Sequence, residues 1–284
     1  MSNLFSIMSQ AAGYIEIPRW YTDLSTMSSA VQTLATSPET TPYSCCWGDD
    51  GNYFYLTGSA TDTIRGYSTS SAYSLSGATY MGNLSISGQE ASTPRSLRVS
   101  LDGTKIYMLG DTGDNVYQYD MTTPFDITSA SYSSKSLSVG TQDGNCLGID
   151  ISRDGTKLYM IGTQNDKIYQ YTLSTAFDIS TASFDSKEVS WAGTGPTTPA
   201  GVKISAGGDK VYIAANSPDT TYEFALSVDF DISTMASTPT ASASHATGGN
   251  NLMQGFDISA DGTEMIATDS ADDLLYRHTI GTAP

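Results

Sequence analysis

Short stretches in which apolar and polar residues alternate recur along the whole chain, and pairs of them enclose tight turns. In the middle of the chain, Ile149-x-Ile151 precedes the turn Asp154-Gly155, and Leu158-Tyr159 follows it. Alternation with a period of two is typical of strands, and an Asp-Gly pair between two such strands predicts a β-hairpin. Equivalent turns lie 52, 52, 53 and 54 residues apart, at Asp50-Gly51, Asp102-Gly103, Asp154-Gly155, Gly207-Gly208 and Asp261-Gly262.

Each hairpin is followed by signals for two further strands. An aspartate stands eleven residues after every turn glycine, and a third alternating stretch follows it. An aromatic-Asp-Ile element such as Phe177-Asp178-Ile179 then leads into a fourth, Ser/Thr-rich stretch, such as residues 131–138 of the second copy. Four strands in a repeat of this length predict the blades of a β-propeller. The aspartates in register are Asp62, Asp114, Asp166, Asp219 and Asp273.

The fifth copy is split between the two ends of the chain. Its third strand, 274–278, is followed by only six residues, where an aromatic-Asp-Ile element is expected. Tyr21 lies 52 residues before Tyr73, in phase with the repeat, so residues from Tyr21 to Leu34 are expected to supply the missing outer strand beside 274–279. The prediction is an all-β, five-bladed propeller of four-stranded antiparallel blades over residues 20–284, preceded by an arm of residues 1–19. Closure of this kind removes a free sheet edge.

The repeat also resembles a known kind of propeller. The run Ser152–Ser180, SRDGTKLYMIGTQNDKIYQYTLSTAFDIS, is similar to repeats of inferred virion proteins of marine bacteriophages and of some bacterial surface proteins, and more distantly to lactonase-like propellers. The resemblance implies a non-enzymatic virion component, serving as a head decoration, a tail part or an attachment module. The alternatives are a carbohydrate-binding surface propeller, or a lactonase- or glycosidase-like enzyme with carboxylates on its axis.

Composition excludes several classes of protein. The formal net charge is −17 without any basic cluster, which argues against a nucleic-acid partner. No apolar run approaches the roughly 20 residues of a membrane span, and the first basic residue is Arg19, so no classical signal peptide is expected. Three cysteines, Cys45, Cys46 and Cys146, are too few for a disulfide framework, and no metal-ligand or phosphate-loop motif occurs. No cofactor is expected.

One position of the innermost strands carries candidate chemistry. Two residues after a ring of small residues (Ser44, Ser96, Gly148, Gly201 and Gly255), charges of alternating sign occur in sequence order at Arg98, Asp150, Lys203 and Asp257. Equivalent positions of adjacent blades are neighbours, which favours a ring of ion pairs. The alternative is an axial active site with Asp150 and Asp257 as its carboxylates. Neighbouring cations keep a carboxylate ionised, whereas a general acid must hold its proton, so no hydrolytic activity is expected.

Three further groups complete the set of candidates. Asp111 and Asp114 are the best candidates for a weak calcium site, and His245 and His278 are interpreted as packing residues. The arm is too apolar for a solvated tail, so it is expected to dock on other virion proteins or to pack on the propeller itself. Host-surface glycans are a second candidate partner, since exposed tyrosines suit adaptable recognition. The apolar arm residues are Leu4, Phe5, Ile7, Met8, Tyr14, Ile15 and Ile17.

Overall fold

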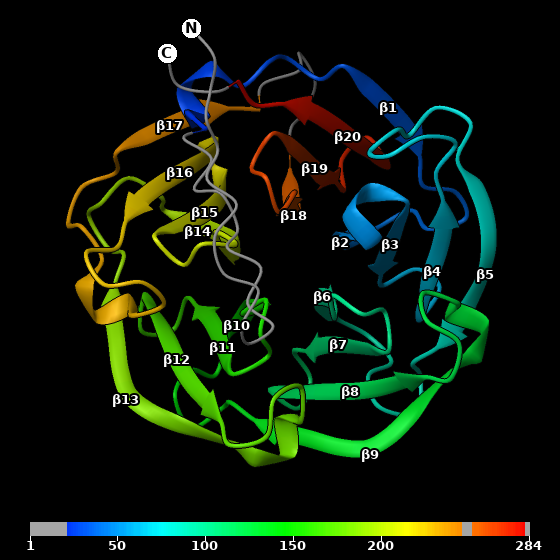
Figure 1. Ribbon diagram of the computed structural model, residues 1–284, viewed down its shortest axis with the longest axis horizontal. Coiled ribbons are helices and arrows are strands. Elements are labelled where there is room, and N and C mark those ends of the chain that lie inside the picture. The colour runs from blue at the N-terminus through cyan, green and yellow to red at the C-terminus, as the bar shows by residue number, and fades with distance from the viewer. Residues whose placement is uncertain (1–21, 246–251, 282–284) are drawn as a thin grey trace, which may run out of the picture.

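Five four-stranded antiparallel sheets surround a central axis in the computed structural model, which describes residues 22–245 and 252–281, except the side chain of Asp49 (Figure 1). The predicted five-bladed propeller is confirmed. From the axis outward, the first three blades are β2 (Pro42–Gly48), β3 (Tyr53–Gly58), β4 (Thr63–Ser68) and β5 (Thr79–Ser85); β6 (Pro94–Val99), β7 (Lys105–Gly110), β8 (Asn115–Met121) and β9 (Ala130–Ser138); and β10 (Cys146–Ile151), β11 (Lys157–Gly162), β12 (Lys167–Leu173) and β13 (Ala182–Ser190). The last two are β14 (Thr198–Ile204), β15 (Lys210–Ser217), β16 (Asp219–Ala225) and β17 (Ala241–Ser244), then β18 (Met253–Ile258), β19 (Glu264–Asp269), β20 (Leu274–Thr279) and β1 (Gln32–Ala35).

The N-terminal segment closes the ring, as predicted. Strand β1 pairs antiparallel with β20, from Gln32 opposite Arg277 to Ala35 opposite Leu274. The strand is shorter than the predicted stretch because residues before it form a 3-10 turn, η1 (Leu24–Thr26), at the place of the aromatic-Asp-Ile elements of the other blades. Leu24 is buried there. The arm residues 1–19, including all seven apolar candidates, lie outside the described residues, as does Tyr21.

The repeated motif residues build turns. In the third blade, one carboxylate oxygen of Asp154 accepts hydrogen bonds from Ser152 Oγ (2.6 Å), Thr156 N (3.0 Å) and Thr156 Oγ1 (2.8 Å). Gly155 follows with a φ of 71°, and a Cβ there would lie 2.5 Å from the ring of Phe177. The S-x-D-G-T and Phe-Asp-Ile elements are therefore two halves of one local structure, in which the aromatic ring covers the turn glycine.

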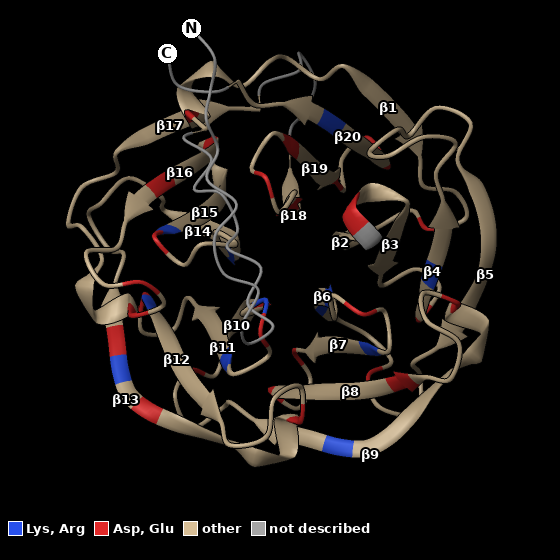
Figure 2. Ribbon diagram, in the orientation of Figure 1, with Lys and Arg blue, Asp and Glu red and all other residues tan. Residues whose placement is uncertain are grey.

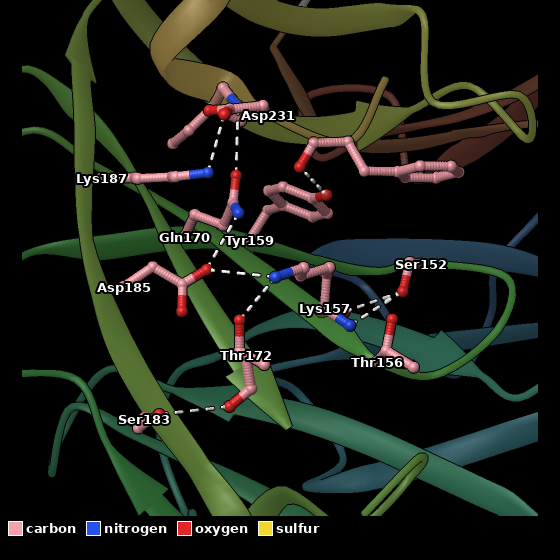
Figure 3. Close-up of polar contacts among 12 residues, drawn as sticks. Ser152, Thr156, Lys157, Tyr159, Gln170, Thr172, Ser183, Asp185, Lys187 and Asp231 are labelled. Carbon is pink, nitrogen blue, oxygen red and sulfur yellow. Dashed lines mark hydrogen bonds and ion pairs between the residues drawn. The ribbon is translucent and has the colours of Figure 1, made fainter. Parts of the chain in front are cut away.

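Neighbouring blades are joined by buried polar contacts as well as by apolar packing. The Tyr159 hydroxyl donates to the backbone carbonyl of Phe230 (3.0 Å), and the side-chain oxygen Oε1 of Gln170 accepts from the backbone amide of Ile232 (3.1 Å). At the outer strand, Lys187 donates to Asp231 (2.7 Å), so three side chains of the third blade bond to the Phe-Asp-Ile element of the fourth (Figure 3). Tyr107, Gln118 and Lys135 of the second blade bond in the same way to Phe177, Ile179 and Asp178 of the third. These contacts hold the 3-10 turns η4 (Ile179–Thr181) and η5 (Ile232–Thr234). At η3 (Ile127–Ser129), Tyr55 of the first blade donates to the carbonyl of Phe125 (2.7 Å), while η2 (Asp49–Gly51) is the first hairpin turn.

Candidate functional site

Inner strands of adjacent blades approach one another closely at the ring of small residues. A Cβ on Gly148 would lie 2.8 Å from the Cα of Gly201, and a Cβ on Gly255 would lie 2.5 Å from a backbone oxygen of the first blade. The hydroxyl of Ser44 accepts a hydrogen bond from the amide of Leu97 in the next blade (3.0 Å). Inner strands of adjacent blades therefore touch here, and one cavity lies at the starts of these strands and another at their ends.

The cavity at the ends of the inner strands, called here the strand-end cavity, contains the four charged residues singled out from the sequence. Arg98 Nε lies 2.9 Å from Asp150 Oδ1. Lys203 Nζ lies 3.3 Å from Asp150 Oδ1 and 3.0 Å from Asp257 Oδ1. The structure thus brings all four together as a chain of three ion pairs that crosses the second, third, fourth and fifth blades. The cavity volume is about 120 Å³.

Backbone groups also bond to three of these charged side chains. Asp150 Oδ2 accepts from the amide of Ile204 (2.8 Å), and Asp257 Oδ2 accepts from the amide of Trp47 (3.0 Å). Arg98 also donates to the carbonyls of Leu97 (2.8 Å) and Val202 (2.9 Å). Each carboxylate is therefore held by a cation and by a backbone amide of the following blade.

Electrostatics at this ring keep Arg98 and Lys203 charged. Burial acts to lower the pKa of the Lys203 ammonium, but Asp150 and Asp257 outweigh burial and raise that pKa above its ordinary value. The same two carboxylates raise the pKa of Arg98 against its own burial. The ring therefore joins the inner strands of four blades through charged contacts.

The cavity at the starts of the inner strands, called the strand-start cavity, was missed by sequence reasoning. Its volume is about 390 Å³, within the range of about 300–1,000 Å³ that is typical of small-molecule sites. All five inner strands have a register shift just before the small residue, so that one residue per strand is left out of the pairing. Such β-bulges re-aim a side chain. The five bulged residues, Tyr43, Arg95, Leu147, Ala200 and Gln254, all line this cavity.

Polar side chains of the strand-start cavity are held in place by neighbours. Arg95 donates twice to Asp111 (2.9 and 3.2 Å), and its guanidinium lies 5.0 Å from the ring centre of Tyr43. Asn145 donates to the hydroxyl of Thr163 (2.6 Å). The cavity therefore presents an aromatic ring, amides and hydroxyls in a fixed arrangement, with its guanidinium already neutralised.

Buried carboxylates brace the loops around this cavity. Asp143 accepts hydrogen bonds from the amides of Asn145 (3.0 Å), Gln164 (3.0 Å) and Asn165 (3.1 Å). Glu90 has the same role one blade earlier. Burial acts to raise the pKa of Glu90, but hydrogen bonds led by that of Thr112 outweigh it, and the pKa stays below its ordinary value. Glu39 braces the first blade. The spacing of these acids follows the repeat, which is the signal that could have found them.

The two aspartates of the candidate calcium site have other interactions in the structure. Asp111 is bonded to Arg95, and burial raises the pKa of Asp114, which favours its neutral form. Among residues 22–245 and 252–281, no group of three or more His, Cys, Asp or Glu side chains is placed to hold a metal ion. In the same part of the chain, no helix is long and apolar enough to cross a membrane.

The two histidines are buried against each other between the fourth and fifth blades. Their ring centres are 5.2 Å apart, His245 bonds to the hydroxyl of Thr221 (2.7 Å), and His278 Nδ1 lies 3.1 Å from the carbonyl of Ser28. Burial, with a smaller contribution from His278, lowers the pKa of His245 to about 3. Both rings therefore pack as neutral groups.

Acid should weaken the protein through His245. The unfolded chain binds a proton at this residue near pH 6.5 and the folded chain only near pH 3, so stability is complete above pH 6.5 and is lost as the pH falls. Between pH 6.5 and 4.5 the free energy of unfolding should fall by about 2–3 kcal/mol for this reason. Urea unfolding of wild type and His245→Ile at both pH values is the measurement, since Ile86 holds the equivalent place in the first blade. The variant should lose less stability on acidification; an equal loss in both proteins would contradict the assignment.

Comparison with known proteins identifies the fold. No protein-family model and no curated protein matches the chain. A Lactobacillus plantarum protein is 15% identical with a TM-score of 0.51, over 86% of this chain and 70% of that one. The periplasmic gluconolactonase of Pseudomonas aeruginosa is 16% identical with a TM-score of 0.47, over 71% of this chain and 53% of that one. A candidate 6-phosphogluconolactonase of Bacteroides uniformis is 11% identical with a TM-score of 0.48, over 80% of this chain and 64% of that one. The likeness is one of fold.

The prediction of a non-enzymatic phage component is corrected by these findings. The structures named above include proteins described as lactonases, the likeness to them is one of fold, and it gives no support to a virion role. The physical reason for the error is that the resemblance depended on the S-x-D-G-T and Phe-Asp-Ile residues. These residues form turns and caps, so they identify a blade and carry no information about a ligand.

Proposed function

We propose that this chain binds a small polyhydroxylated molecule, of the chemical class of the sugars, in the strand-start cavity. The observation that carries the proposal is that amide and hydroxyl side chains line a cavity of about 390 Å³ together with the aromatic ring of Tyr43. An amide group both donates and accepts hydrogen bonds, as does each hydroxyl of a sugar. The polar lining residues that suit such a ligand are Asn145, Thr163, Thr197, Thr198, Asn216 and Gln254.

Preorganisation supports the same conclusion. Asn145 and Gln254 are each hydrogen-bonded to a neighbouring hydroxyl, and the loop that carries Asn145 is fixed by the buried carboxylate of Asp143. Side chains that are already ordered lose little entropy when a ligand binds. Tyr43 supplies an apolar surface for the C–H face of a sugar ring, with one ring face next to Arg95.

The strand-end cavity is the weaker candidate. Its volume of about 120 Å³ is below the usual range for a ligand site. The charges of Asp150, Lys203 and Asp257 are already paired with one another and with backbone groups. A ligand there would have to break bonds that join the blades.

Calorimetric titration of the full chain with neutral sugars and with gluconolactone tests the proposal. The lactone belongs in the panel because its ring carries the same hydroxyls, and its disappearance during the titration would report turnover. Tyr43→Ala should weaken binding by about tenfold, equivalent to about 1.4 kcal/mol. Tyr80→Ala is the matched control, because Tyr80 is 44% exposed on the outer strand β5, away from the cavity. Absence of binding to every member of the panel, or equal binding by wild type and Tyr43→Ala, would contradict the proposal.

A further inference from the structure

Asp166 is the acidic side chain that lines the strand-start cavity. It lies in the turn between β11 and β12 with a φ of 55°, and its backbone oxygen accepts from the amide of Trp191 (3.2 Å). Within the described part of the chain, its carboxylate has no ion pair and no hydrogen bond from a side chain or an amide. The neighbouring Lys167 is paired with Glu188 instead. Asp166 therefore brings an uncompensated negative charge to the cavity wall.

Among the residues that the structure describes, no cation lining the cavity is free to balance this charge. Arg95, the basic lining residue, forms a two-point contact with Asp111. Acidic residues are concentrated in turns and at strand ends (Figure 2), and the equivalent turns of the other blades carry an aspartate as well, at Asp62, Asp114, Asp219 and Asp273. The net charge of −17 on the whole chain favours the approach of a cationic ligand over that of an anionic one.

Resting on the proposed function, we infer that the ligand is an amino sugar whose ammonium group pairs with Asp166. The carboxylate supplies the partner for the positive charge, while Asn145, Thr163 and Asn216 supply partners for hydroxyls. A charged pair adds more to binding than a neutral hydrogen bond. A phosphorylated sugar would meet the carboxylate of Asp166 without a free cation to offset it, so the cavity discriminates against it.

Competition among three probes tests the inference: glucosamine, glucose and a phosphorylated glucose, titrated into the full chain at pH 6, where the amine is protonated. Wild type should bind glucosamine at least tenfold more tightly than glucose, and should bind the phosphorylated sugar most weakly. Added salt should reduce the preference for glucosamine, since exposed charges are screened.

Asp166→Asn isolates the charge, because asparagine tolerates the left-handed backbone at this turn. This variant should lose the preference for glucosamine and keep its affinity for glucose. Asp62→Asn, at the equivalent turn of the first blade and outside the cavity lining, is the matched control and should behave as wild type. Equal affinity of wild type for glucosamine and glucose, or a preference retained in Asp166→Asn, would overturn the inference while leaving a sugar site in place. Failure of all three probes to bind would overturn the proposed function with it.

Discussion

Replacing Arg98 by methionine is expected to lower the free energy of unfolding by about 3–5 kcal/mol. Arg98 is 5% exposed and forms hydrogen bonds with Asp150 and with the carbonyls of Leu97 and Val202. The substitution leaves these acceptors buried without their donor, and Asp150 retains only Lys203 as a cationic partner. For a chain of this size, the melting temperature should fall by at least about 6 °C.

Lys105→Met is the control for this experiment. Lys105 is paired with Asp120 at 3.0 Å, but the two side chains are 26% and 44% exposed. An ion pair of this kind contributes under about 1 kcal/mol, because solvent screens it. If Arg98→Met lowers the free energy of unfolding no more than Lys105→Met does, the ring of charged side chains around Arg98 is not a buried connection between blades.

Removing residues 1–36 is expected to lower the melting temperature by more than about 10 °C. The deletion takes away the four-residue pairing of β1 with β20 and the buried side chain of Leu24, whose loss alone costs about 2–5 kcal/mol. It also exposes the edge of β20, which becomes open to pairing with another chain.

A deletion of residues 1–19 separates the arm from the closing segment. This shorter deletion keeps Leu24 and β1, so its melting temperature should equal that of the full chain. Calorimetry of the three proteins is the measurement. A protein lacking residues 1–36 that melts together with the full chain would contradict the closure seen in the fifth blade.

The fold was predictable because similar local interactions recur along the chain. Asp154 and Gly155 have equivalents near 52-residue intervals, and the turns of the second, third and fifth blades use the same hydroxyl and carboxylate contacts. In the fourth blade Gly207 stands in place of the aspartate, and Ser205 bonds to Asp209 instead. The split repeat also placed the closing strand, although Thr22 and not Tyr21 occupies the position of Tyr73, next to the turn glycine Gly262. No 3-10 turn was predicted in any copy, because the aromatic-Asp-Ile pattern marks where the outer strand follows and does not indicate the helical geometry of the turn itself.

The candidate site was far less predictable. A ligand site in a ring of repeats is built at the positions where the repeats differ, and Tyr43, Arg95 and Gln254 share no residue type. Their common property is the β-bulge before the small residue, which depends on the close approach of adjacent inner strands. The axial charges were visible as alternating signs at one register position, but only the distances showed that backbone amides complete their coordination.

Hydrogen exchange with and without a saturating amino sugar tests most directly whether the strand-start cavity is the ligand site. The full chain in glucosamine should show slowed exchange at amides around this cavity, in the segments that carry Asn145, Thr163 and Asn216. Exchange at the hairpin turns beside the strand-end cavity, such as that of Ser152–Gly155, should stay unchanged. Protection confined to those turns, or exchange that is identical with and without the sugar, would contradict the account.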